Sequence, residues 1–115
     1  MTSPTPQPER RRAARALADF PIRFSEDDEQ EPAILRDISE IGLACTSPRE
    51  VPEMTLVALD FSLPGSSAIH HVKGAVVRCE PMPKGRYDMA VYFTETSAET
   101  RLALAGYVTS AHPAP

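Results

Sequence analysis

The chain has 115 residues, 42% of them hydrophobic, and a formal net charge of −4 from 12 basic and 16 acidic side chains. This length supports one compact core and not two, so we predict a single domain. The negative balance argues against nucleic-acid binding, which needs a broad basic face. No apolar run approaches the ~20 residues that cross a membrane, and the start lacks a signal peptide's apolar stretch, so we expect a cytoplasmic protein without membrane insertion.

The N-terminal segment is first rich in proline and then in arginine. Residues 9–15 hold four arginines in seven positions: Arg10, Arg11, Arg12 and Arg15. We predict a disordered tail over residues 1–8, a domain over 9–110 that begins with a flexible arginine segment at 9–18, and a second disordered tail over 111–115. Taken alone, this arginine cluster is more typical of a solvated basic tail than of a binding site.

Six stretches then show the patterns of β-strands. They are predicted at residues 20–24, 33–38, 43–45, 55–63, 69–79 and 86–93, with a solvent-facing acidic turn at 25–31 and a loop at 46–53. Within the fifth stretch, strict alternation puts Val72 and Val76 on one face and Ala75, Val77 and Cys79 on the other.

The C-terminal stretch changes to a helical pattern. Thr96 and Glu99 have the spacing of a capping box, and Leu102, Ala105 and Val108 recur at helical spacing, with Leu104 and Tyr107 beside them. We predict one helix of roughly 12 residues that packs against the end of the strands. Short strands with regular turns favour closure, so the expected fold is mainly β: a six-stranded antiparallel β-barrel with a C-terminal α-helix.

Catalytic and metal signals are weak. Cys45 and Cys79 are isolated among apolar residues, and we interpret them as small core side chains. His70 and His71 are adjacent, so on a strand they face opposite sides and do not easily share a site. The sequence shows no nucleophile–base pattern, glycine-rich phosphate loop or metal motif. We therefore expect no enzymatic activity, no metal and no cofactor.

A second motif, Asp37-Ile38-Ser39-Glu40-Ile41-Gly42, follows the arginines about one strand downstream. An ionised Asp37 is an acceptor that suits the N1–H and N2–H donors of guanine, the Ser39 hydroxyl donates or accepts, and Gly42 allows a positive φ or a close approach. Guanidinium groups bind phosphate oxygens and guanine O6 and N7. Alone, the Asp/Ser segment also fits a turn built only for geometry. Together, the two motifs predict a site for a ligand with phosphates and guanines.

The combination resembles the PilZ domain, a bacterial receptor module for cyclic di-GMP. The resemblance rests on Arg11-Arg12-Ala13-Ala14-Arg15, on Asp37-x-Ser39-x-x-Gly42, and on three softer matches in order: Phe61–Pro64, Gly74–Arg78 and Tyr87–Phe93. Ala90 stands where the family commonly has glycine. The resemblance covers roughly residues 9–108 and implies a six-stranded barrel with an added helix, whose arginine segment wraps the ligand against the barrel.

By the same resemblance, Arg11, Arg12 and Arg15 contact phosphates and guanines, Asp37 and Ser39 contact a guanine, and Gly42 shapes the turn. An arginine at position 10 is associated with two intercalated ligands, so the number of ligands per chain stays open. The implied function is a non-catalytic cyclic di-GMP receptor in bacterial second-messenger signalling. It would control motility, surface or biofilm behaviour through an unidentified downstream protein.

Two alternatives remain open at this stage. One is a ligand-independent PilZ-fold adaptor that acts by protein–protein contact, against which the intact motifs count. The other is a single-stranded nucleic-acid binder on a small barrel, against which the net charge of −4 and the absence of an obvious aromatic platform count.

Overall fold

A computed structural model describes residues 15–18, 20–26 and 29–110 of the chain. The two predicted tails and the arginines at positions 10–12 lie outside these residues. The elements in chain order are β1 (Ala16–Leu17), β2 (Pro21–Glu26), β3 (Glu29–Ile38), β4 (Gly42–Ser47), β5 (Leu56–Phe61), β6 (His70–Met82), a 3₁₀ turn (Pro83–Gly85), β7 (Arg86–Glu95) and α1 (Ala98–Ser110).

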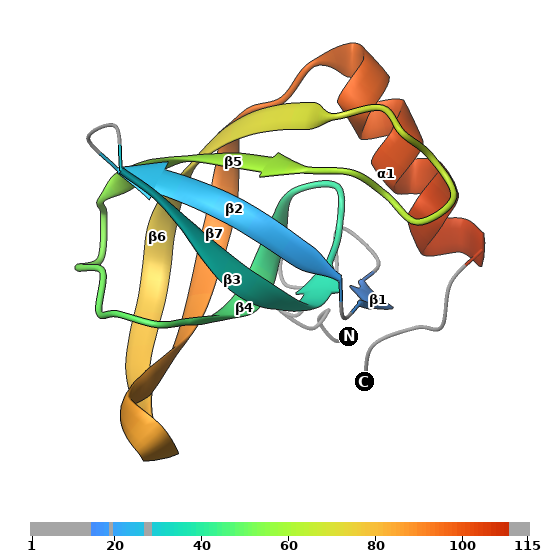
Figure 1. Cartoon of the computed structure of the whole chain (residues 1–115). Coiled ribbons are helices and arrows are strands. Elements are labelled where there is room, and N and C mark those ends of the chain that lie inside the picture. Colours follow the sequence, from blue (N-terminus) through green and yellow to red (C-terminus); the bar gives the residue numbers. More distant parts are fainter. Residues whose placement is uncertain (1–14, 19, 27–28, 111–115) are drawn as a thin grey trace, which may run out of the picture.

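The barrel consists of two antiparallel meanders, β2-β3-β4 and β5-β6-β7, joined along two seams (Figure 1). At one seam β2 pairs with β5, and at the other β4 pairs with β7, with Gly42 opposite Tyr92. The short β1 pairs with β3 beyond the end of β2, where Leu17 lies opposite Asp37. The predicted six-stranded antiparallel barrel with one C-terminal helix is therefore confirmed, and β1 is an addition within the segment expected to be flexible.

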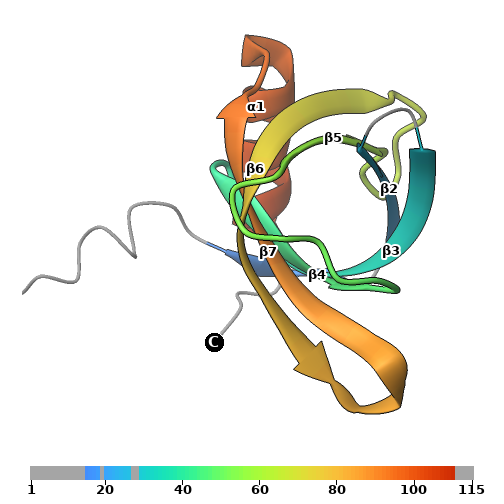
Figure 2. The ribbon, with the colours of Figure 1, turned by 90° about the vertical axis from the view of Figure 1, so that its left-hand side faces the viewer.

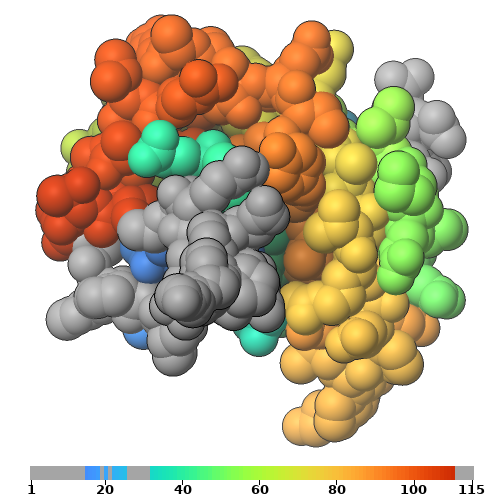
Figure 3. Space-filling view, turned by 180° about the vertical axis from the view of Figure 1, so that it is seen from behind, coloured from blue at the N-terminus to red at the C-terminus, as the bar shows by residue number. Residues whose placement is uncertain are grey.

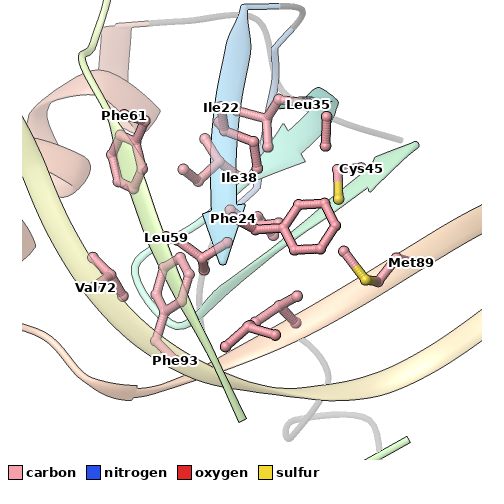
Figure 4. Close-up of a cluster of buried hydrophobic side chains, with 14 of the residues drawn as sticks. Ile22, Phe24, Leu35, Ile38, Cys45, Leu59, Phe61, Val72, Met89 and Phe93 are labelled. Carbon is pink, nitrogen blue, oxygen red and sulfur yellow. The ribbon is translucent and has the colours of Figure 1, made fainter. Parts of the chain in front are cut away.

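The inner faces of the strands form one apolar core (Figure 4). Alternate residues along each strand point inward because side chains in a strand have a period of two. Phe24, Leu59 and Met89 are among the largest side chains that are fully buried there. Cys45 also lies fully inside, as predicted, and both cysteines are free thiols.

The helix α1 covers one end of the barrel, but its details differ from the sequence prediction. Its N-terminal cap is Ser97 and not Thr96, since the Ser97 Oγ accepts a hydrogen bond from the Thr100 amide at 3.0 Å. Thr100 and Leu104 are buried, Ala103 and Tyr107 pack partly buried against the core, and Leu102 is exposed. The predicted face was wrong because several apolar side chains at helical spacing gave two possible faces, and packing on the barrel selects the other one.

Two hairpins extend further than predicted. The acidic residues at 25–31 belong largely to the β2–β3 hairpin, whose last register pair is Glu26 with Glu29, so the seven-residue turn expected there is wrong. The β6–β7 hairpin continues to Met82 and Arg86 and projects beyond the rest of the barrel (Figure 2). Strand pairing thus extends over acidic residues in the first hairpin and over Pro81 in the second, although both residue types favour a loop.

A β-bulge in β3 interrupts the alternation next to the second motif. Leu35 and Asp37 pair with consecutive residues of β4, so Arg36 is an extra residue, and we call residues 35–37 the β3 bulge. Leu35 and Ile38 are both buried, whereas Arg36 and Asp37 between them face outward. Because a bulge shifts the alternation by one residue, it turns the Asp37 carboxylate to the outside of the barrel.

A second bulge in β6 has the same form. Val76 and Arg78 pair with consecutive residues of β7, so Val77 is the extra residue, and we call residues 76–78 the β6 bulge. Val77 and Arg78 both face outward, and Cys79 returns to the inner side, where it packs partly buried against the core. The predicted placement of Cys79 on the face of Val77 was wrong because strict alternation does not include this extra residue.

Candidate functional site

The structure brings together one residue from each of the two sequence motifs. The pairing of β1 with β3 places Arg15 beside the end of β3, and its Nη1 donates to the Asp37 Oδ1 at 2.6 Å. The Asp37 Oδ2 has no hydrogen bond within the part of the chain that the structure describes. Since two carboxylate oxygens offer about four acceptor positions, Asp37 retains accepting capacity after its bond to Arg15, and its side chain is 19% exposed.

Ser39 lies inside the turn that follows β3. Its Oγ accepts hydrogen bonds from the amides of Ile41 at 3.1 Å and Gly42 at 3.2 Å, and donates to the Gly42 carbonyl at 3.2 Å. The side chain is buried, so its position is that of a turn-forming serine. The turn fixes the end of β3 next to Asp37, and direct contact of Ser39 with a guanine stays a prediction.

Gly42 is required by close packing between β4 and β7. A Cβ added to this residue would lie 2.5 Å from the Val91 carbonyl oxygen, a distance that real Cβ atoms do not adopt. Of the two roles considered for Gly42, the structure shows close approach of another strand. The glycine thereby sets the spacing of the seam on which the candidate site lies.

Outward-facing residues form a row across this seam, which we call the alanine row: Asp37, Ala44, Ala90 and Arg78. Each lies opposite the next on β3, β4, β7 and β6. Ala44 faces away from the core cluster, to which its neighbours Leu43 and Cys45 both belong, but it is only 2% exposed. Ala90 is partly exposed, so the row has two short central side chains between an acidic end and a basic end.

Charged side chains connect the two bulges beside the alanine row. The Asp88 Oδ1 accepts a hydrogen bond from the Arg36 Nη2 at 2.6 Å, and its Oδ2 lies 3.6 Å from the Arg78 Nη2. The exposed ring of Tyr92 lies on the other side of the row. Sequence reasoning did not select Arg36, Arg78 or Asp88, because their proximity depends on the pairing of distant strands and, for Arg78, on the β6 bulge that turns it outward.

Cys45 lies directly behind this face and is chemically quiet. Burial raises the pKa of its thiol to about 12, an effect that the nearby Arg36 opposes and Asp88 adds to. The thiol is therefore protonated at neutral pH and is a poor nucleophile. This agrees with its interpretation as a core residue.

The two histidines face opposite sides, as predicted. His70 is buried and its Nδ1 is hydrogen-bonded to the Thr100 Oγ1 at 2.8 Å, which joins β6 to α1. The exposed His71 Nδ1 lies 2.6 Å from the Asp60 Oδ1, between two open pockets of about 430 and 510 Å³. A smaller pocket of about 280 Å³ includes Tyr92 and Arg101.

Two other kinds of site can be addressed within the described ranges. Residues 15–18, 20–26 and 29–110 contain no group of three or more His, Cys, Asp or Glu side chains that could hold a metal ion. Over those same residues, no helix has the length and hydropathy needed to cross a membrane.

The fold and the site define a small β-barrel domain with a conformationally fixed aspartate and an arginine beside it on the outer wall. A model of the PilZ domain matches residues 9–110, and the chain therefore belongs to the PilZ domain family. The resemblance predicted from the two motifs is thus confirmed. No match was found among curated proteins.

Solved structures of the same fold include two bacterial proteins. The inhibitor of motility MotI/DgrA of Bacillus subtilis is 17% identical, with a TM-score of 0.76 over 93% of this chain and 51% of that one. The PilZ domain of Escherichia coli YcgR, determined with c-di-GMP, is 19% identical, with a TM-score of 0.64 over 88% and 90%. This chain thus spans about half the length of MotI. At these identities the likeness concerns the fold.

Proposed function

We propose that this protein is a non-catalytic receptor for cyclic di-GMP that transmits the signal through a downstream protein. The observation that carries the proposal is the contact between the two motifs, where Arg15 donates to an outward-facing Asp37. Membership of the PilZ family and the c-di-GMP in the YcgR structure support this choice of ligand. The MotI likeness supports motility as a process that such a receptor would control.

The proposed contacts follow from the chemistry of each group. A guanine presents N1–H and N2–H to the Asp37 carboxylate, which has accepting capacity left after its bond to Arg15. Arg15, together with Arg10, Arg11 and Arg12, supplies guanidinium groups for phosphate oxygens and for guanine O6 and N7. Ala90 of the alanine row is short and partly exposed, and we expect a flat guanine ring to lie against the barrel wall beside it.

Titration calorimetry with cyclic di-GMP tests the proposal. We expect the wild-type protein to bind near micromolar concentrations. Asp37→Ala and Arg15→Ala each remove a charge-assisted contact worth about 1.5–3 kcal/mol, so each should weaken binding by about one to two orders of magnitude. Absence of binding by the wild-type protein would contradict the proposal and would leave the ligand-independent adaptor as the better reading.

Asp60→Ala is the matched control for these variants. Like Asp37, Asp60 forms a contact of 2.6 Å with a basic side chain, in this case His71, but it lies on β5 in the other meander. Both variants lose one carboxylate that contacts a neighbouring side chain, so a difference in their affinity for the ligand reports on the position of that carboxylate. We expect Asp60→Ala to bind cyclic di-GMP like the wild type. Calorimetric stoichiometry for Arg10→Ala addresses the separate question of one or two ligands per chain.

A further inference from the structure

The outer wall of the second meander exposes a set of large apolar side chains. Met54 is 74% exposed, Leu56 71% and Val77 49%. They are neighbours, because the Met54 amide donates to the Val76 carbonyl at 2.7 Å and Leu56 lies opposite Ala75 on β6. We call these three side chains the apolar band. Exposed apolar clusters of this kind in a small protein mark interaction surfaces.

The backbone at Met54 is held in an unfavourable conformation. Its φ is 72°, in the left-handed region that favours glycine and is unfavourable for residues with a Cβ. Hydrogen bonds from the Met54 amide to the Val76 carbonyl and from the Thr55 amide to the Pro52 carbonyl fix this turn. The fold thus uses a strained turn to display an exposed methionine, and backbone strain of this kind concentrates at functional positions.

The β6 bulge connects the apolar band to the candidate site. Val77 belongs to the band, and the next residue, Arg78, ends the alanine row. A second connection runs across the sheet, where Ala75 lies between Leu56 on β5 and Tyr92 on β7. Figure 3 shows the green segment around residues 50–56 directly beside the yellow strand β6 on this face of the molecule. The band is therefore continuous with the wall that carries the candidate site.

The charges around the band are acidic. Glu50, Glu53 and Glu80 are exposed, and none of them forms an ion pair within the described part of the chain. The Val51 amide donates to the Cys79 Sγ at 3.4 Å, and this contact holds the loop that carries Glu50 and Glu53 against the end of β6 that carries Glu80. The basic residues of β6 are occupied, since Arg78 faces Asp88 and Lys73 lies 3.5 Å from Glu95.

The acidic charges decide which kind of molecule can bind to the apolar band. A second copy of the chain in a two-fold contact would bring the same carboxylates together and would be repelled. The segments outside the described residues contain no large apolar side chain except Met1, so they do not supply a complementary surface. An apolar segment with interspersed lysines or arginines fits both the band and its acidic surroundings.

We propose that the apolar band is the docking surface for a partner protein segment that presents apolar side chains together with basic ones. Docking itself does not depend on the nucleotide. Its location next to the alanine row gives it a role in signal output, and that role rests on the proposed function.

Methyl NMR on methionine-labelled protein tests the docking directly. The chain has four methionines, of which Met54 belongs to the band, Met89 is fully buried and Met82 lies at the hairpin end. The probes are two amphipathic helical peptides of about 18 residues with leucine on one face and either lysine or glutamate elsewhere. We expect the lysine peptide to shift the Met54 signal in a saturable way, the glutamate peptide to leave it unchanged, and Met89 to stay constant with both.

Variants of the band separate a specific surface from general attraction to an acidic protein. The double variant Leu56→Ser, Val77→Ser should weaken binding of the lysine peptide about tenfold or more, since truncating central apolar contacts costs over 1 kcal/mol. Leu102→Ser, at a side chain that is also 74% exposed but lies on α1, should bind like the wild type. An unshifted Met54, equal shifts with both peptides, or unchanged affinity in the double variant would overturn the proposal.

Two further measurements, of self-association and of cyclic di-GMP binding, separate failure of the docking proposal from failure of the proposed function. A Met54 shift that depends on protein concentration without peptide, together with a dimer in sedimentation equilibrium, would show that a second copy occupies the band and overturn the basic partner. Cyclic di-GMP titration of the double variant should give wild-type affinity. If neither protein binds the nucleotide while the lysine peptide still docks, the proposed function fails and the docking surface stands.

Discussion

The β3 and β6 bulges have the same geometry and opposite surface chemistry. Each adds one residue to a strand that flanks the β4–β7 seam, and each turns two consecutive side chains outward. The β3 bulge exposes Arg36 and Asp37, which carry charges, whereas the β6 bulge exposes Val77 next to Arg78. An outward-facing carboxylate and part of an exposed apolar band thus both lie at β-bulges, and the residue type decides which kind of surface results.

Deletion of Arg36 tests what the extra residue of the β3 bulge contributes. Leu35 and Asp37 already pair with consecutive residues of β4, so after the deletion Leu35, Asp37 and Ile38 still alternate inward, outward and inward. The deletion removes the ion pair with Asp88 and the hydrogen bond from the Ala18 amide to the Arg36 carbonyl, so we expect a loss of about 2–3 kcal/mol in the free energy of unfolding without loss of the fold. Chemical denaturation measures the change.

The matched point variant keeps the bulge and removes only the side chain. Arg36→Ala should lose less than about 1 kcal/mol, because Arg36 forms a partly exposed ion pair. Similar losses for the deletion and for Arg36→Ala would show that the side chain and not the added backbone residue is responsible.

Gly42→Ala sharpens the comparison by changing the seam between the two bulges. The new methyl group would collide with the backbone oxygen of Val91, so one strand must move, and we expect a loss of about 2–3 kcal/mol. Thermal and denaturant unfolding both report this change. Gly106→Ala is the control, since no atom lies near an added Cβ on α1, and it should stabilise the protein by up to about 1 kcal/mol.

Asp88→Asn has the smallest expected effect and tests the link between the bulges. The carboxylate contacts Arg36 from one bulge and Arg78 from the other, and all three side chains are partly exposed. We expect a loss of about 0.5–1 kcal/mol that high salt reduces in the wild type. A double-mutant cycle with Arg36→Ala measures the coupling, and a coupling near zero would show that the two bulges are energetically independent.

The fold could be predicted from the sequence because apolar and polar residues alternate regularly along most strands. Val57, Leu59 and Phe61 point inward as expected, as do Met89 and Val91 on β7. The same logic failed at Cys79, where the extra residue Val77 reverses the inner and outer positions. The sequence of one strand does not show which of its residues will be the extra residue of a bulge, because the position of a bulge depends on the pairing with the neighbouring strand.

Part of the candidate site could also be predicted from the sequence. The spacing of Asp37, Ser39 and Gly42 predicted a turn, and the Arg15 contact with Asp37 joins the two motifs. The sequence did not reveal Asp88 or Arg78, which reach the site only through pairing across the barrel. Local motifs are visible in a sequence, whereas residues contributed by distant strands require the register of those strands.

The position of the site across a seam has a consequence for the dynamics of the barrel. Asp37 and Ala44 belong to the first meander, and Ala90 and Arg78 to the second, so a molecule bound along this row holds the two halves together. Opening of the β4–β7 seam would then require dissociation of that molecule. Amide hydrogens along this seam should exchange with solvent more slowly as ligand concentration rises, and those of the β2–β5 seam should change less.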